Sequence, residues 1–379
     1  MTANKFDFII FCAIFKVDSL KARRLLVPHK KFGKVGFVLC GGACLEGLPQ
    51  AAQLREFAKA EIEPDWLGAV SVGAFNALDR KNVIDVWKNQ ITSPFKIYDL
   101  NPSLKKVFKD ARQFIAPFKK HDTWKEWMRD FKSQKQNAWQ LFSFCKRTIF
   151  SALKIARDFP NGDFANQKNF SSVSEFAISA LKEHDLYNLS SILDIEPIMK
   201  AVEENIDLQS VFQGPPLNIF VRRLETGKEQ ILTPKSVPEL RLALRAASAL
   251  VPFFEPVKIG EKYFCDIGGV NPFPVEYAFD AGCDTVFAFA KGRKQDFKKP
   301  ANVIEAWFAE LEIYTTRIFI LLFAKARERA KKEGKKLYLI TPQDQHPDLG
   351  FLSISPKAVE YAMRVESEAT QKFIEKILK

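Results

Sequence analysis

The segment Val35-Gly36-Phe37-Val38-Leu39-Cys40-Gly41-Gly42-Ala43 decides the fold class of this chain. Its first six residues form a short apolar run that predicts a buried strand, and the glycines after it predict a tight turn. Residues 45–59 then show helical periodicity. The run Leu67-Gly68-Ala69-Val70 predicts a second strand, and residues 72–78 predict a second helix. Strand, turn and helix repeated in this order indicate an α/β protein with a mostly parallel sheet.

The composition fits a folded globular protein. The chain has 379 residues, of which 47% are hydrophobic and 27% charged, and this length allows one large domain or two ordinary ones. The six cysteines form no CxxC pair and no zinc-like spacing with histidine. We therefore expect reduced thiols in a cytoplasmic protein, with no metal site and no cofactor.

The α/β pattern returns in the second half of the chain. Strands are predicted at residues 218–222, 230–232, 285–289 and 335–340, and helices at 197–205, 239–250, 303–332 and 357–378.

Residues 104–188 interrupt this pattern. Helix formers, bases and aromatics dominate residues 104–157, where fourteen Lys and Arg stand against four Asp and Glu, so this part carries +10 of the net charge of +12. We predict a helical basic and aromatic insertion or lid. It could bind an anionic membrane surface, or it could be a solvated subdomain whose aromatics pack inward. No nucleic acid is expected as a partner, because no nucleic-acid-reading motif accompanies the charge.

The N-terminus holds the apolar run Phe8–Phe15, which is too short to span a bilayer. Residues 1–33 are interpreted as an amphipathic arm, either an interfacial helix or a docked segment. Residues 34–379 are then expected to form one domain that contains the insertion at 104–188. The apolar run at 318–324 is also too short to span, so no transmembrane segment is expected.

Three short motifs follow predicted strands. In Ala69-Val70-Ser71-Val72-Gly73, small residues lie two places on each side of a serine, as a nucleophile elbow between strand and helix requires. Gly41, Gly42 and Ala43 would leave backbone N–H groups free for an oxyanion or a phosphate. Asp266-Ile267-Gly268-Gly269 places an aspartate at a strand end. Taken singly, each motif also fits an ordinary turn.

The order of these motifs resembles the patatin-like phospholipase family. The glycine loop, the Ser71 elbow and the Asp266 block each match a family motif, and Ala246-Ala247-Ser248-Ala249-Leu250-Val251-Pro252 matches the family's alanine–serine block. The resemblance covers residues 34–379 except most of the basic insertion. It implies a three-layer α/β/α fold and a Ser–Asp dyad.

In that dyad, Ser71 would be the nucleophile and Asp266 the general base, and the amides of Gly41, Gly42 and Ala43 would form the oxyanion hole. The expected activity is hydrolysis of the acyl esters of phospholipids or related lipids, in the cytoplasm and peripheral to a membrane. The sequence leaves the oligomeric state open.

The histidines argue against a Ser-His-Asp triad. The chain has only His29, His121, His184 and His346, and only the last follows the aspartate, in a turn-like context.

Three departures from the family leave alternatives open. Ala43 replaces a loop glycine, Leu45 and Glu46 stand near the place of a basic residue, and Ile267 replaces the first glycine after the aspartate. The chain could instead be a catalytically weak relative that binds lipid or a partner. It could also be a thioesterase or acyltransferase that uses the same dyad.

Overall fold

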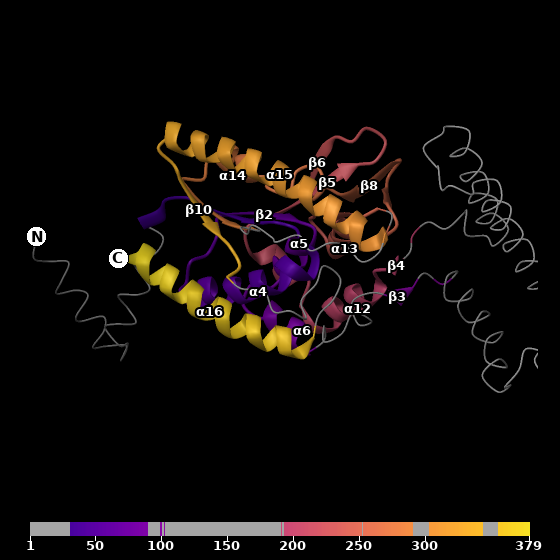
Figure 1. Cartoon of the computed structure of the whole chain (residues 1–379), viewed down its shortest axis with the longest axis horizontal. Coiled ribbons are helices and arrows are strands. Elements are labelled where there is room, and N and C mark those ends of the chain that lie inside the picture. The colour runs from indigo at the N-terminus through magenta and orange to yellow at the C-terminus, as the bar shows by residue number, and fades with distance from the viewer. Residues whose placement is uncertain are drawn as a thin grey trace, which may run out of the picture. The chain divides into compact units, whose positions relative to one another are not determined.

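The computed structural model describes residues 31–89, 99–100, 102, 191, 193–251, 253–290, 303–343 and 355–379 (Figure 1). The chain divides into two compact units, one of residues 1–99 with 194–379 and one of residues 100–193. Almost all of the predicted arm and the whole basic insertion at 104–188 lie outside the described residues, so the predictions made for them stay predictions.

The first unit is built on an eight-stranded sheet. Its strand order is β10-β9-β1-β2-β5-β8-β7, with β6 paired to β5. Neighbouring strands from β10 to β5 are parallel, whereas β6, β7 and β8 pair antiparallel. The strands are β1 (Val35–Leu39), β2 (Trp66–Val70), β5 (Leu217–Arg223), β6 (Glu229–Leu232), β7 (Val257–Ile259), β8 (Lys262–Asp266), β9 (Thr285–Phe289) and β10 (Lys336–Ile340). Two short strands, β3 (Asp99–Leu100) and β4 (Leu193–Asp194), form a separate sheet.

Helices cover both faces of the large sheet (Figure 1). One face carries α14 (Val275–Asp280) and α15 (Val303–Lys332). The helices of the other face are α4 (Ala43–Lys59), α5 (Val72–Asn76), α6 (Val83–Asn89), α12 (Glu196–Asn205), α13 (Val237–Ser248) and α16 (Pro356–Leu378). A short 3-10 helix, η3 (Ser210–Gln213), precedes β5.

The larger core lies between the sheet and α4, and phenylalanines dominate it. The ring of Phe57 on α4 stands edge-on to those of Phe37, Phe287 and Phe289, with centroid distances of 5.6, 5.1 and 5.1 Å. Every residue of β1 and of β9 is buried. Strands that are buried on both faces appear in sequence as continuous apolar runs, which is why these two were predictable.

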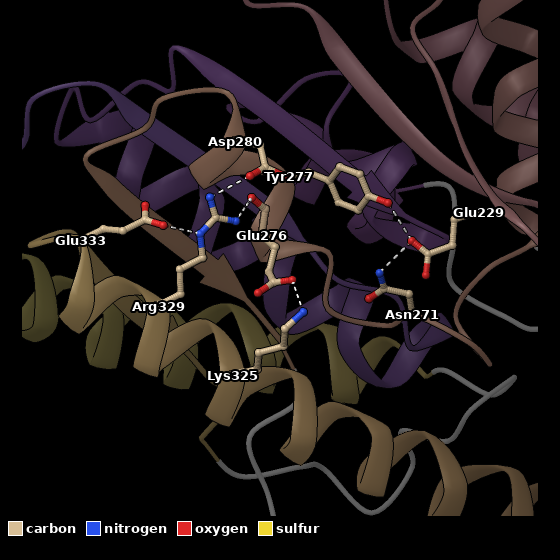
Figure 2. Close-up of polar contacts among 8 residues, drawn as sticks. All are labelled: Glu229, Asn271, Glu276, Tyr277, Asp280, Lys325, Arg329 and Glu333. Carbon is tan, nitrogen blue, oxygen red and sulfur yellow. Dashed lines mark hydrogen bonds and ion pairs between the residues drawn. The ribbon is translucent and has the colours of Figure 1, made fainter.

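On the opposite face, α15 is attached to α14 by ion pairs (Figure 2). Lys325 approaches Glu276 to 2.7 Å, and Arg329 approaches Asp280 to 2.7 Å. Such exposed pairs contribute little, about 0–1 kcal/mol each. Apolar packing contributes more. The ring centroids of Phe273 and of Phe319 on α15 are 4.9 Å apart. Because Phe273 lies in the segment that follows Asp266, this packing holds that segment against α15.

The structure confirms the three-layer α/β/α fold. The strand at 285–289 and the helix at 303–332 have the predicted bounds, and the other strands and helices predicted within the described residues lie within a few residues of theirs. The antiparallel direction of β6 to β8 and the helices α6 and α14 were not predicted. Among the described helices, none has an apolar stretch long enough to cross a bilayer.

Candidate active site

Ser71 lies on a sharp turn between β2 and α5. Its backbone has φ 53° and ψ −127°, and only one other non-glycine residue in the described part of the chain, Glu61, has a positive φ. Such a conformation is strained for a residue with a side chain and persists where the surrounding structure enforces it. It is the geometry of a nucleophile elbow, which lifts the serine hydroxyl clear of the backbone.

The elbow is closed by contacts with β1. A Cβ atom placed on Gly73 would lie 2.4 Å from the carbonyl oxygen of Leu39, so α5 approaches this strand as closely as a glycine allows. Ala69, two residues before the serine, is fully buried and is the register partner of the same Leu39. The two small residues expected from the sequence therefore adjoin one residue of the neighbouring strand.

Strand β5 brings Ser71 and Asp266 together. Val70 at the end of β2 pairs with Phe220, and Asp266 at the end of β8 pairs with Val221. Because β6 occupies the other edge of β5 at both positions, β2 and β8 meet end to end along the same edge. The hydroxyl group of Ser71 lies close enough to the carboxyl group of Asp266 to lower the pKa of that carboxyl group.

The carboxyl group of Asp266 is buried, with 8% of the residue exposed. Burial raises its pKa from 3.8 to about 6, because charge is disfavoured away from water. The nearby hydroxyl of Ser71, the hydrogen bond that Oδ1 accepts from the N–H of Gly268 at 2.7 Å, and the charge of Arg222 act in the opposite direction. A carboxylate with a pKa near 6 is ionised at neutral pH and can still accept a proton from serine.

The glycine loop lies directly against the elbow. A Cβ atom on Gly41 would lie 2.8 Å from Cβ of Ser71, so only glycine permits this approach. Gly42 has a φ of 154°, and α4 begins at Ala43. The N-terminus of α4, with its partial positive charge, therefore begins next to the serine.

An acidic residue and a cysteine lie beside this loop. Glu46, in the first turn of α4, is only 3% exposed. Burial, with a further contribution from Glu46, raises the pKa of the Cys40 thiol well above its usual range. Cys40 therefore stays protonated at neutral pH and does not compete with Ser71 as a nucleophile.

Three other residues around Asp266 were not recognised as functional in the sequence. Ile267, judged there only as a departure from the family, is fully buried and packs with Val70 and Phe220. Arg222 was not considered, although its charge acts on Asp266. Glu229 belongs to no sequence motif, and only its contacts in the structure draw attention to it.

No described side chains suggest a metal. Within the ranges that the structure describes, no cluster of three or more His, Cys, Asp and Glu could hold an ion. His29, His121, His184 and His346 all lie outside those ranges.

Fold and site together define an α/β protein in which a serine on a strand–helix elbow lies beside a buried aspartate. The family model for patatin-like phospholipases matches residues 37–279, more than half of the chain. The chain therefore belongs to the patatin-like phospholipase family, whose members are lipid acyl hydrolases. The fold is also similar to the crystal structure of VipD from Legionella pneumophila, with a TM-score of 0.38 and 12% identity over 90% of this chain and 67% of that one. No curated protein sequence gives a match.

Proposed function

We propose that this chain is a serine hydrolase that cleaves carboxylic esters of phospholipids or related lipids through a Ser71–Asp266 dyad. The observation that carries this proposal is that the elbow serine adjoins a buried aspartate whose pKa is about 6. A buried carboxylate can act as the general base here, and the described site contains no histidine to do so.

In the proposed mechanism, Oγ of Ser71 attacks the ester carbonyl carbon while its proton passes to the carboxylate of Asp266. The negative oxygen of the tetrahedral intermediate is held by the amides of Gly41, Gly42 and Ala43, at the N-terminus of α4. The intermediate collapses, and Asp266 returns the proton to the leaving alcohol. Water then attacks the acyl-serine and gives a proton to Asp266. As the bond between the acyl carbon and Oγ breaks, Asp266 passes this proton to Oγ of Ser71 and the fatty acid is released.

A fluorophosphonate probe tests the nucleophile directly. We expect the probe to modify the wild type at Ser71, as mapped by mass spectrometry, and labelling to be absent in Ser71→Ala. Ser248→Ala is the matched control, because this serine also has a buried hydroxyl and its neighbour Ala249 accepts a hydrogen bond from the N–H of Asp266. Labelling that persists in Ser71→Ala, or an unlabelled wild type, would contradict the proposal.

The two alternatives differ in substrate and rate. Hydrolysis of acyl-CoA faster than of phospholipid would favour a thioesterase or acyltransferase. Labelling of Ser71 without turnover of any ester would favour a catalytically weak lipid-binding relative. The buried Glu46 beside the oxyanion loop is the structural feature that supports this alternative.

We further propose that the protein acts at an anionic membrane surface in the cytoplasm. Helix α15 exposes Tyr314, Ile320 and Leu321, with 55%, 58% and 70% of each residue accessible. Arg317 and Arg327 are exposed on the same helix. Large apolar side chains among cations suit the interface of a bilayer that contains anionic lipid. The described cysteines, Cys40, Cys265 and Cys283, are free thiols, which suits a reducing compartment.

Vesicle flotation tests the membrane proposal. We expect the wild type to float with vesicles that contain anionic phospholipid and not with neutral ones, and the double variant Ile320→Glu/Leu321→Glu to bind roughly fivefold less. Leu224→Glu is the control, because Leu224 is also exposed, at 43%, but follows β5. Equal flotation with neutral and anionic vesicles, or an equal loss in the control, would exclude this role of α15.

A further inference from the structure

The segment after Asp266 folds into a tight turn. The N–H groups of Val270 and Asn271 both donate to the carbonyl oxygen of Ile267, at 2.7 and 2.9 Å. The side-chain oxygen of Asn271 accepts a bond from the N–H of Phe273 at 3.2 Å. Asn271 is 8% exposed, so its amide group requires partners. The turn is therefore organised around this one asparagine.

Glu229, at the start of β6, holds this turn from outside (Figure 2). Its Oε2 atom accepts hydrogen bonds from Nδ2 of Asn271 and from the hydroxyl of Tyr277, both at 3.0 Å. Burial and the nearby Glu229 raise the pKa of Tyr277 to about 12. The tyrosine hydroxyl thus remains a donor throughout the neutral range.

The same turn also packs against the elbow. Ile267 is buried together with Val70 and Phe220, and Tyr277 packs on this group. The rings of Tyr277 and Phe220 are 5.0 Å apart. Because Val70 precedes Ser71 and Ile267 follows Asp266, the contact between them sets the separation of the two site residues. A shift of the turn would therefore change the distance between the side chains of Ser71 and Asp266.

We propose that Glu229 is a positioning residue that holds Asp266 in hydrogen-bonding distance of Ser71 by clamping Asn271 and Tyr277. This inference rests on the proposed dyad. Glu229 would not touch the substrate. It would act on the catalytic step, whose rate depends steeply on the alignment of the reacting groups, and not on substrate affinity.

Two substitutions of Glu229 distinguish the effect of its two hydrogen bonds from the effect of its negative charge. Both hydrogen bonds end on the same oxygen, so the amide oxygen of Glu229→Gln can accept both, whereas Glu229→Leu accepts neither. We expect kcat to fall about 5- to 10-fold in Glu229→Leu, with KM within about twofold of the wild type, and to recover to within about twofold in Glu229→Gln. Tyr277→Phe, which keeps the ring on Phe220 and removes one bond, should lie between the two.

Glu225→Leu is the matched control for stability. Glu225 lies on the same β5–β6 hairpin, accepts a bond from the N–H of Tyr263 at 2.8 Å and pairs with Arg223. Its loss should lower stability without changing kcat. A role of Glu229 that is only structural would make Glu225→Leu and Glu229→Leu alike.

The outcomes distinguish this proposal from the proposed function. If the fluorophosphonate probe does not label Ser71 in the wild type, the proposed Ser71–Asp266 dyad is wrong, whatever the kinetics of the Glu229 variants show. If Ser71 is labelled, wild-type kcat in Glu229→Leu, or equal losses in the Gln and Leu variants, overturns the clamp. Should Glu229→Leu fail to fold, Tyr277→Phe decides, because wild-type kcat in this milder variant would overturn the clamp too.

Discussion

Replacing Asp266 with asparagine is expected to make the protein more stable at pH 7 and to lower ester hydrolysis about a thousandfold. The loss of activity follows from the mechanism, because asparagine cannot accept the proton of Ser71. The gain in stability follows from burial, which makes the ionised carboxylate of Asp266 unfavourable in the folded protein.

The pH range of this stability gain follows from the two pKa values. The carboxyl group of Asp266 has a pKa of about 6 in the folded protein against 3.8 as its ordinary value. Well below pH 3.8 it is protonated in both states, and the wild type has no penalty. Between pH 4 and 6 the unfolded chain releases the proton first, so wild-type stability falls as pH rises. Above pH 6 the difference is constant, on the order of 1–3 kcal/mol once the weaker hydrogen bonds of asparagine are allowed for.

Urea unfolding at pH 4 and pH 7 measures the effect. We expect the difference in stability between wild type and Asp266→Asn to be large at pH 7 and much smaller at pH 4, and wild-type kcat/KM to rise with an apparent pKa near 6. Asp280→Asn is the control, because Asp280 is exposed and pairs with Arg329 at 2.7 Å, so its replacement should not stabilise. If Asp266→Asn is no more stable than the wild type at pH 7, the buried carboxylate of Asp266 does not destabilise the folded protein.

The parallel half of the sheet was predictable because its strands are covered on both faces. Residues 285–289 are all buried, and the sequence shows them as an unbroken apolar run. The antiparallel half lacks this signal. In β8, Lys262 and Tyr263 are exposed and the next three residues are buried, and β7 has only three residues, none of them buried. Strands this short and half-exposed carry no distinct periodicity.

The residues themselves predicted the candidate site only as separate motifs, and the family resemblance alone implied that Ser71 and Asp266 act together. The small residues around Ser71 revealed the elbow, because the motif places them at fixed positions two residues on each side of the serine. The meeting of Ser71 and Asp266 depends on two strands that share one edge of β5, and such non-local pairing leaves no mark in either motif. For the same reason Ile267 was taken as a departure from the family pattern. In the structure it packs against the residue before Ser71.

Replacing Gly73 with alanine should be among the most disruptive single changes to the described fold. The new Cβ atom would lie 2.4 Å from the carbonyl oxygen of Leu39 and 2.9 Å from its carbonyl carbon. These are backbone atoms of the buried strand β1, which cannot rotate away as a side chain could. We expect a loss of stability of about 3 kcal/mol and loss of fluorophosphonate labelling, because α5 would move away from β1 and take Ser71 with it.

Gly214→Ala is the matched control for this change. Gly214 has a φ of −95°, which alanine adopts freely, and a Cβ atom there would meet only the carbonyl oxygen of Val211, at 3.9 Å. Its stability should stay within about 0.5 kcal/mol of the wild type. If urea unfolding finds Gly73→Ala as stable as Gly214→Ala, close packing on Leu39 does not hold the elbow. If Gly73→Ala is destabilised but still labelled at the wild-type rate, this contact supports the fold without setting the position of the nucleophile.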